Sequence, residues 1–424
     1  MVATSTICVD AIACGPDGLV RPAGEVAWAV RVQNGVISSV DECPSQSGRL
    51  RILTPTLVNA HDHGRGHGTQ LLGVRDAPLR EWISAFVGAT RQDVQYEQVS
   101  VALAQMRDGG IGAATICVNP TTSDRDQEVR IAAAAARDIG IRAAIAVPIF
   151  TVPPETYREG RHCSAQAWLS ATAELDRVDA LADELSGDGI EILYHPVGPQ
   201  WVSEDLLRAC AQRSAATGRI VHMHLLETTA QRNWAMQTYH DGMVAAFGAM
   251  GLLTPSAVFA HGVYLSDDEL ALLAANGCSV VINVSSNFRL ASGIAPIDRI
   301  AAAGANFGIG LDGMALDDDL DMWRELRLVR GLWQAQRLAT VDAAEVIQAA
   351  TTAGALGLGT AAPEPVRLGN RADFVVHDLS KWVELAELPA WPAPEIVLAG
   401  ASRLTVAEVW CRGARVYLAD QVEC

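Results

Sequence analysis

The sequence lacks any apolar run of the ~18 residues needed to cross a bilayer. Residues 1–18 also lack the basic segment and long apolar stretch of a secretory signal. We therefore expect a cytoplasmic protein that does not act on a membrane. Positive charge is scarce as well: the formal net charge is -17, which argues against nucleic acid or an anionic membrane as a partner. A small anionic ligand remains compatible, because one arginine in a pocket acts locally.

No C-x-x-C pair occurs among the nine cysteines, and 424 residues is far longer than the scaffolds that disulfides hold together. Half of the residues are hydrophobic, enough to bury a large core in one large domain with a smaller companion. We expect reduced thiols, several of them in the core, at positions 8, 14, 43, 117, 163, 210, 278, 411 and 424.

From about residue 52, short apolar runs alternate with longer segments rich in alanine and leucine. This alternation is typical of β-α units around a parallel sheet, and eight such strands predict a closed (β/α)8 barrel. The predicted strands are 52–60, 113–118, 142–149, 190–195, 219–225, 257–261, 279–284 and 306–312.

Both ends of the chain have a different pattern. Residues 1–50 show short alternating apolar stretches separated by glycine, proline and aspartate. The tail from about residue 366 shows the same pattern of short strands and turns, in ADFVVHDLS, EIVLAG and VAEVWCRGARVYLAD. We therefore predict an α/β fold: a TIM-like (β/α)8 barrel at 55–365 with a small β-sandwich domain built from both termini, 1–54 and 366–424.

Metal-capable side chains fall at the carboxyl ends of several predicted strands. In a barrel these ends meet at one face, where catalytic residues lie. The convergence is the main evidence for function. The residues, in chain order, are His61 and His63, His195, His222 and His224, His261 and Asp312.

The strongest local patterns are HDH at 61–63 and VHMHLLET at 221–228. Residues two apart on a strand point to the same side, so His61 and His63 can grip one cation, although alone they could equally be loop histidines. His224 supplies a third imidazole and Glu227 a nearby carboxylate. His222 is interpreted as a hydrogen-bonded core histidine.

Asp312, in GLDG, is the candidate fourth ligand. Three imidazoles and one aspartate suit one divalent metal, zinc first, with iron or manganese as alternatives. The metal would lower the pKa of a bound water toward ~7. Asp312 would deprotonate that water, Glu227 would carry the proton to the leaving group, and His261 would hydrogen-bond the water or the developing oxyanion. The downstream acidic run is interpreted as surface or capping residues: Asp317, Asp318, Asp319 and Asp321.

The chain resembles the amidohydrolase superfamily, in its branch of cytosine-, guanine- and triazine-type deaminases and chlorohydrolases. Seven segments carry the resemblance in the right order, over nearly the whole chain. They are PTLVNAHDH, DAPLREWI, VHMHLLET, AHGVYL, SSNFRLASGIAP, GLDG and RADFVVHD.

The resemblance implies a metal-dependent hydrolase of a small molecule, with His61, His63, His224 and Asp312 as metal ligands. It also implies Glu227 and His261 as catalytic partners. No lysine ends strand four, where two-metal relatives carry a carboxylated bridging lysine, so one metal ion is expected. By analogy with the family, a homo-oligomer is an alternative to a monomer.

Three departures from the branch pattern stand out. Thr56 replaces a glycine, and Leu311 replaces the serine or threonine before the aspartate, which affects the surroundings of the metal. In YHPVGPQWVSEDLL, at 194–207, Gln200 takes the place of a substrate-facing histidine if the Gly-Pro pair is aligned; His195 is the competing alignment.

Substrate contacts are predicted after the first and fourth strands. The Gln200 amide could read the N–H/C=O edge of a lactam or amidine, as could Gln70. Arg65 and His67 could meet a carbonyl or carboxylate, with a solvated arginine as the alternative. Trp82, Phe86, Trp201 and Phe288 could wall a planar ring or simply pack in the core.

These features favour deamination: water adds to the ring carbon that bears an exocyclic amine, and ammonia leaves. Candidate rings are pyrimidines, purines, pterins and triazines. Hydrolysis of a cyclic amide or an acyclic C–N bond, as in imidazolone-type hydrolases, is the alternative within hydrolases. A non-catalytic binding relative fits less well, because the ligands, the proton shuttle and the strand-six histidine are all present.

Overall fold

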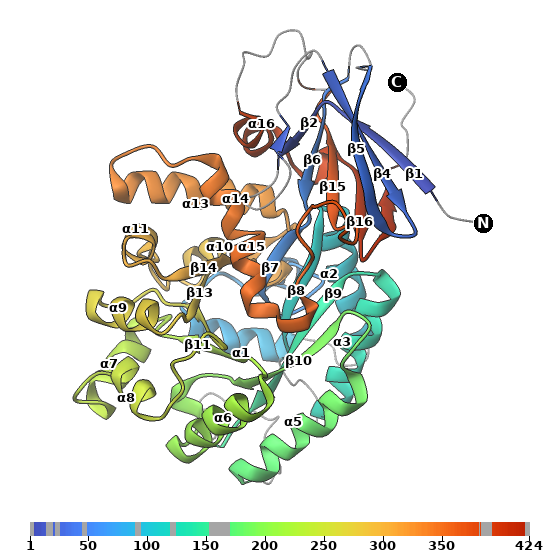
Figure 1. Cartoon of the computed structure of the whole chain (residues 1–424). Coiled ribbons are helices and arrows are strands. Elements are labelled where there is room, and N and C mark those ends of the chain that lie inside the picture. Colours follow the sequence, from blue (N-terminus) through green and yellow to red (C-terminus); the bar gives the residue numbers. More distant parts are fainter. Residues whose placement is uncertain are drawn as a thin grey trace.

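The computed structural model describes residues 4–13, 20–21, 26–44, 49–89, 95–118, 124–151, 170–380, 382 and 392–419. Figure 1 shows a barrel surrounded by helices, with β-rich layers above it that carry both ends of the chain. Among the described residues, no helix is both long enough and apolar enough to span a bilayer.

The barrel is an eight-stranded parallel sheet in sequential order, which confirms the predicted (β/α)8 fold. Its strands are almost wholly buried, because helices cover the outside and side chains fill the inside, so they form continuous apolar runs. Asp312 N–H donates to His61 O at 3.1 Å, which joins the segment after the last strand to the first. The strands are β7 (Leu57–Asp62), β8 (Ile111–Cys117), β9 (Arg142–Ile149), β10 (Ile190–Pro196), β11 (Val221–Leu225), β12 (Ala257–His261), β13 (Ser279–Ile282) and β14 (Asn306–Ile309).

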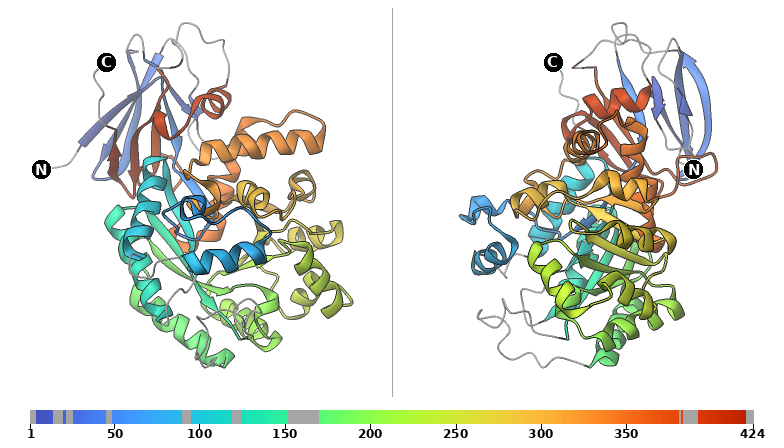
Figure 2. Two further views of the ribbon diagram at one scale, coloured as in Figure 1. Left: turned by 180° about the vertical axis from the view of Figure 1, so that it is seen from behind. Right: turned by 90° about the vertical axis from the view of Figure 1, so that its left-hand side faces the viewer.

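Helices follow the barrel strands and wrap the sheet (Figure 2). Several begin at side-chain caps: Ser266 and Glu269, for example, form a reciprocal capping box at the start of α9. The longer helices are α1 (Leu79–Ala89), α2 (Gln95–Asp108), α3 (Arg125–Ile139), α5 (Ala171–Leu185), α6 (Glu204–Thr217), α7 (Thr229–Thr238), α8 (Met243–Ala249), α9 (Asp267–Ala275), α13 (Met322–Arg337) and α14 (Ala343–Ala349). The shorter ones are α10 (Val284–Arg289), α11 (Ile297–Ala302), α12 (Met314–Asp317), α15 (Thr352–Ala355), η1 (Thr69–Leu72), η2 (Pro199–Trp201), η3 (Leu356–Ala361) and η5 (Arg403–Thr405).

Two further sheets form the β layers, and one of them joins both ends of the chain, as predicted. In that six-stranded sheet β6 (Arg51–Pro55) lies antiparallel to β15 (Phe374–Asp378). Its remaining strands are β2 (Ala11–Ala13), β3 (Val20–Arg21), β16 (Val406–Cys411) and β17 (Ala414–Leu418). The three-stranded sheet contains β1 (Thr4–Val9), β4 (Val26–Gln33) and β5 (Val36–Pro44). The exact domain boundaries, 54/55 and 365/366, stay predictions.

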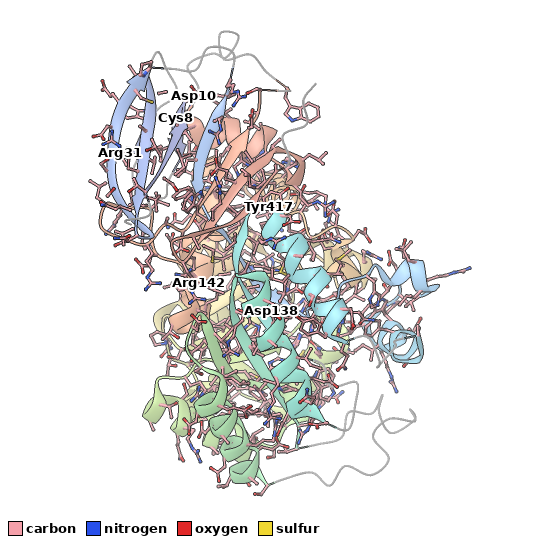
Figure 3. All side chains as sticks on the ribbon, turned by 90° about the vertical axis from the view of Figure 1, so that its right-hand side faces the viewer. Cys8, Asp10, Arg31, Asp138, Arg142 and Tyr417 are labelled. Atoms are coloured by element: carbon pink, nitrogen blue, oxygen red, sulfur yellow. The ribbon has the colours of Figure 1, made fainter. Side chains whose placement is uncertain are left out.

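An ion pair joins the β layers to the barrel. Arg142, the first residue of β9, donates to both carboxylate oxygens of Asp373 at 2.6 and 3.0 Å. Arg142 and Tyr417 are labelled in Figure 3, near the meeting of the two regions. Because Arg142 lies at the amino-terminal end of its strand, the β layers leave the carboxyl ends of the barrel strands uncovered at this place.

Two predicted strands are corrected by the structure. The run 52–60 is divided at Thr56 into β6 and β7, because the chain passes there from the β layers into the barrel. The segment EIVLAG is not a strand but lies in helix α16 (Ala393–Gly400). Ala393, Ile396 and Val397 are buried at helical spacing, but a short apolar run such as Ile396–Gly400 does not by itself distinguish a helix from a strand.

Smaller differences concern strand ends and single residues. Strands β13 and β14 end at Ile282 and Ile309, earlier than predicted, so Asp312 lies in a loop. In the acidic run Asp321 caps α13, as expected, but Asp317 is buried beside Arg324 rather than on the surface. Free thiols occur at Cys8, Cys43, Cys117, Cys210, Cys278 and Cys411, whereas Cys14, Cys163 and Cys424 lie outside the described residues.

His377 of β15 provides a stability prediction away from the barrel mouth. Its buried ring packs against Trp323, and burial lowers its pKa to about 3. The unfolded chain therefore binds a proton at His377 more tightly, so stability falls as the pH falls from about 6.5 toward 3. Between pH 8 and pH 5 this one group accounts for about 2 kcal/mol of lost stability.

We expect His377→Gln to lose less stability than the wild type between pH 8 and pH 5, measured by denaturant unfolding at both values. The difference between the two pH values is the readout, because it cancels any constant packing cost of the substitution. An identical loss in both proteins would contradict the prediction.

Candidate metal centre

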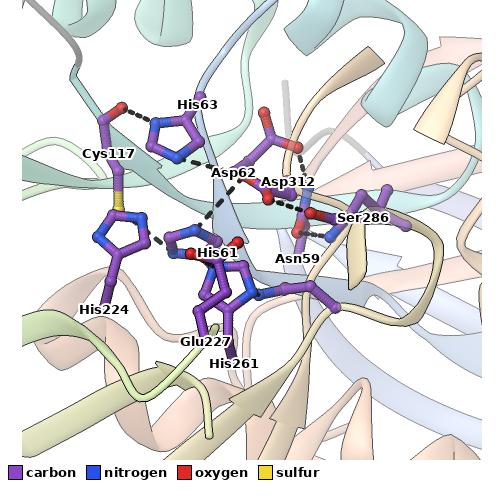
Figure 4. Close-up of polar contacts among 12 residues, drawn as sticks. Asn59, His61, Asp62, His63, Cys117, His224, Glu227, His261, Ser286 and Asp312 are labelled. Atoms are coloured by element: carbon purple, nitrogen blue, oxygen red, sulfur yellow. Dashed lines mark hydrogen bonds and ion pairs between the residues drawn. The ribbon is translucent and has the colours of Figure 1, made fainter. Parts of the chain in front are cut away.

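Four predicted site residues, which lie at the ends of the first, fifth and eighth strands or in the loops that follow them, gather with His261 at one end of the barrel (Figure 4). The ring centre of His61 lies 5.1 Å from that of His63, 4.9 Å from that of His224 and 5.4 Å from that of His261. Asp312 reaches the same place from the loop after β14, with its Oδ1 3.2 Å from His63 Nε2. The barrel thus gathers residues that are up to 251 positions apart, from His61 to Asp312.

Backbone carbonyls hold two of the rings in place. His63 Nδ1–H donates to Cys117 O at 2.9 Å, and His224 Nδ1–H donates to Val197 O at 2.7 Å. With the proton on Nδ1, a neutral imidazole carries its lone pair on Nε2, the form in which histidine binds a metal.

Two buried atoms at the centre of this cluster make no hydrogen bond with the described residues: His61 Nε2 and Asp312 Oδ1. They lie 3.6 Å apart. Ligand atoms of His61, His63 and Asp312 all lie within 4.8 Å of one another, as do those of His61, His224 and His261. Because buried polar atoms ordinarily have partners, this donor set fits a divalent cation bound among them.

The electrostatics of the cluster keep its donors in the form that a cation requires. Burial, reinforced by neighbouring charged groups, lowers the pKa of His61, His63 and His224 well below the usual range, so these rings are neutral near pH 7. Burial by itself would raise the pKa of Asp312, but the neighbouring side chains of His63, His261 and Arg65 and the Ser286 hydrogen bond hold it below its usual value. The site therefore offers three lone pairs and one carboxylate.

The backbone at the site is strained at two positions. Asp312 has a φ of 62° and His261 a φ of 74°, in the left-handed region that residues with a Cβ rarely adopt. Such conformations persist only where the surroundings fix them, and they gather at functional sites. Nothing in the sequence pattern indicated this feature.

Several supporting residues were not singled out from the sequence. Ser286 Oγ donates to Asp312 Oδ2 at 2.6 Å. Asn59 Nδ2 donates to Asp62 Oδ2 at 2.8 Å, and Asn59 Oδ1 accepts from Leu311 N at 3.0 Å. Leu311 thus acts here through its backbone, although the family pattern has serine or threonine at this place. Asn59 could have been identified from its position in the LVNAH segment, and Ser286 from its position in the SSN segment.

Glu227 and His261 lie next to each other, with His261 Nε2 4.0 Å from Glu227 Oε2. Glu227 is 2% exposed, and burial raises its pKa, so this carboxyl group can hold a proton at higher pH than a surface glutamate can. His261 Nδ1–H donates to Asn287 Oδ1 at 3.0 Å, and Asn283 Nδ2 lies 3.3 Å from the same ring nitrogen, so Nε2 is the ring nitrogen directed toward Glu227.

His195 and Gln200 differ in how the structure places them. His195 is fully buried in β10, and its Nδ1–H donates to the backbone oxygen of His222 at 2.6 Å. Gln200 is half-buried in η2, three residues beyond Val197, the residue whose carbonyl holds His224. Gln200 is the more exposed of the two residues, and which of them faces a substrate stays a prediction.

The other predicted substrate contacts lie around the loop after β7. Arg65 is half-buried, with its guanidinium carbon 4.6 Å from the Phe86 ring centre and 5.3 Å from that of Trp82. Trp82 is 2% exposed and stacks on Phe86 in a small apolar cluster. These contacts support the interpretation that Trp82 packs in the core. Gln70 is exposed and His67 half-buried. Their contacts with substrate stay predictions.

The sequence matches the Amidohydrolase family over residues 52–416, which covers the whole barrel and part of the β layers. The chain belongs to this family. A 5-methylthioadenosine/S-adenosylhomocysteine deaminase of Haloarcula marismortui is 31% identical over 352 residues, 81% of this chain and 76% of the relative. A 5'-deoxyadenosine deaminase of Methanosarcina barkeri is 28% identical over 83% of this chain and 80% of its own length.

Solved structures agree with this amidohydrolase assignment. An adenosine deaminase from Xanthomonas campestris, solved with bound zinc, has a TM-score of 0.80 and 27% identity, covering 98% of this chain and 94% of that one. The resemblance inferred from the seven segments is therefore confirmed at the level of the family.

Gly310 gives a prediction about the geometry of this amidohydrolase site. A Cβ at this position would lie 2.7 Å from His61 O and 2.9 Å from His61 Cβ, so the backbone beside the ligand histidine would have to move. We expect Gly310→Ala to destabilise the fold by about 1–3 kcal/mol and to weaken zinc binding.

The matched control is Gly331→Ala in α13, where an added Cβ meets nothing within 4 Å. There alanine should be neutral or stabilising by about 0.5–1 kcal/mol, since it favours a helix interior. Thermal unfolding and zinc content measure both effects. Equal changes in unfolding temperature and in zinc content for the two variants would show that β7 and the segment after β14 are not held as closely as described.

Proposed function

We propose that the chain is a mononuclear metal-dependent aminohydrolase that removes an exocyclic amine from a small nitrogen heterocycle. The observation that carries the proposal is the convergence of His61, His63, His224 and Asp312 around orphaned buried atoms, with a protonatable Glu227 beside them. The balanced reaction consumes one water. The bond between a ring carbon and the exocyclic amine nitrogen breaks, a ring carbonyl forms and ammonia leaves.

Zinc is the proposed metal, because the donor set is nitrogen and oxygen and the Xanthomonas campestris relative was solved with zinc. Its ligands would be His61, His63, His224 and Asp312. When bound, it supplies a Lewis acid that lowers the pKa of water toward ~7. One ion rather than two is proposed, because the end of β10 carries His195, not a lysine, and that histidine is already bonded to a backbone oxygen.

The side chains divide the proton transfers among them. Asp312 Oδ1, without a hydrogen bond among the described residues, takes a proton from the attacking water. Glu227 Oε2 delivers its proton to the ring nitrogen, which its raised pKa favours. As the ring carbonyl forms, Glu227 takes up the hydroxyl proton of the tetrahedral adduct and passes it to the departing amine. The proton held by Asp312 then returns to Glu227, which restores both groups. His261 Nε2, whose ring is positioned through Asn287, hydrogen-bonds the water or the developing oxyanion.

The proposed substrate class is a planar ring with an amidine-like N–C–NH2 edge. The named relatives are deaminases of adenosine-type compounds, which makes 6-aminopurine nucleosides the first compounds to test. The Gln200 amide would read the ring edge, and Arg65, backed by Phe86, would meet a carbonyl or an anionic substituent. Hydrolytic opening of a cyclic amide uses the same water and the same metal, so it remains the second candidate.

The test of the activity is ammonia release by the purified zinc-loaded chain. Adenine and cytosine nucleosides and bases, pterins and aminotriazines are supplied separately, and products are identified by mass spectrometry. We expect equimolar ammonia and a product with an intact ring in at least one class. A ring-opened acid would instead identify the second candidate, and no turnover of any of these compounds would count against deamination of them.

Glu227→Gln tests the proposed proton carrier. Glutamine keeps the shape but cannot carry a proton between water and amine, so kcat should fall about 10²–10⁴-fold. Zinc content should be unchanged, because Glu227 is not among the clustered metal-binding groups. Steady-state kinetics and elemental analysis measure the two quantities.

Glu269→Gln is the matched control. Glu269 is also a buried glutamate, but it caps α9 and pairs with Arg232 outside the site. Its variant should keep kcat even if its melting temperature falls. Full turnover by Glu227→Gln would refute the proposed mechanism.

A further inference from the structure

His61 differs from His63 and His224 in how it is held. Its Nδ1 lies 2.9 Å from Nε2 of another buried histidine, His222, instead of a backbone carbonyl. The two ring planes are only 6° apart and the ring centres are separated by 5.1 Å. A centre-to-centre distance this much longer than the N···N distance means that the rings meet edge to edge, so the hydrogen bond lies in the plane of both.

The direction of this hydrogen bond follows from the site. A bond between two imidazoles needs one N–H donor and one lone pair. His61 Nε2 faces Asp312 Oδ1, so a cation bound there requires the lone pair of His61 on Nε2 and the proton on Nδ1. His61 Nδ1–H is then the donor, and His222 Nε2 is the acceptor.

Cys117 is a weaker candidate for the same role. Its Sγ lies 3.4 Å from His61 Nδ1, and a thiol is a poor acceptor compared with an imidazole nitrogen in the ring plane at 2.9 Å. The geometry favours His222 as the partner of the proton.

His222 is itself fixed through the neighbouring strand. Strands β10 and β11 share one backbone register pair, Tyr194 with Val221, whereas β9 and β10 are paired along their whole length. The His195 side chain takes the place of a missing ladder bond by donating from Nδ1 to His222 O at 2.6 Å. His195 thus holds the backbone of His222, and the His222 ring in turn contacts His61.

We propose that His222 is a positioning residue of the metal centre, which accepts the His61 Nδ1 proton and so fixes the tautomer and ring angle that present Nε2 to the cation. The neutral His222 imidazole, as an acceptor, places no negative charge beside His61. A carboxylate in the same place would make His61 more basic, so the imidazole leaves the bound cation more electrophilic. This inference rests on the proposed metal site.

The test compares zinc affinity in His222→Gln and His222→Leu, measured by competition with a chelator of known affinity. The glutamine Oε1 can reach the position of histidine Nε2 and accept the proton, whereas leucine cannot. We expect the zinc Kd to rise about 10–100-fold in His222→Leu and to stay near the wild-type value in His222→Gln. Melting temperatures of the metal-free proteins are recorded alongside.

His377→Leu is the matched control, because His377 is equally buried but lies in β15 outside the site. It should leave the zinc Kd unchanged, whatever it does to stability. Wild-type affinity in a folded His222→Leu, or equal losses in the glutamine and leucine variants, would overturn the proposal.

A second measurement needs only the zinc-loaded wild type labelled with 15N-histidine. A scalar coupling between His61 Nδ1 and His222 Nε2 across the hydrogen bond is expected, and a proton on His222 Nε2 would overturn the assignment even if the leucine variant does not fold. His61→Leu separates the two levels of inference. If it binds zinc as well as the wild type, the proposed metal site itself is wrong; if it loses zinc while His222→Leu does not, only the role of His222 fails.

Discussion

The closure of the barrel is the constraint on which the site depends. The hydrogen bond from Asp312 N–H to His61 O joins the segment after the last strand to the first, and each side of this junction supplies side chains of the proposed metal site. Gly310 permits the approach, since a Cβ there would collide with His61. A barrel that closed less tightly would hold the same residues but would not bring the carboxylate within 3.6 Å of the His61 imidazole.

Burial gives these residues their chemistry. The same desolvation that keeps the clustered histidines neutral raises the pKa of Glu227, so one buried cluster holds imidazole lone pairs and a carboxyl group able to carry a proton. Asp312 stays ionised in this environment because Arg65, the nearby imidazoles and the Ser286 hydrogen bond compensate for its burial. Acid, base and ligand roles are thus separated by environment.

The support of the three imidazoles is unequal. Carbonyls from the ends of neighbouring segments hold His63 and His224, so their orientation follows from the backbone of the barrel. His61 relies on a side chain, His222, and through it on His195. A centre supported in both ways can be altered at His222 without changing the backbone that positions the other two rings.

The sequence by itself determined the strand order, the joining of both termini in the β layers and the set of metal-capable residues, because strand periodicity and strand-end position are local properties. It did not separate β6 from β7 or identify EIVLAG as a helix, since a short, mostly apolar segment fits either structure. Only the tertiary structure decided that His195 supports His222, that Trp82 packs under Arg65 and that Ser286 and Asn287 orient Asp312 and His261. Those contacts join segments far apart in the chain, and their geometry exists only once the barrel has closed.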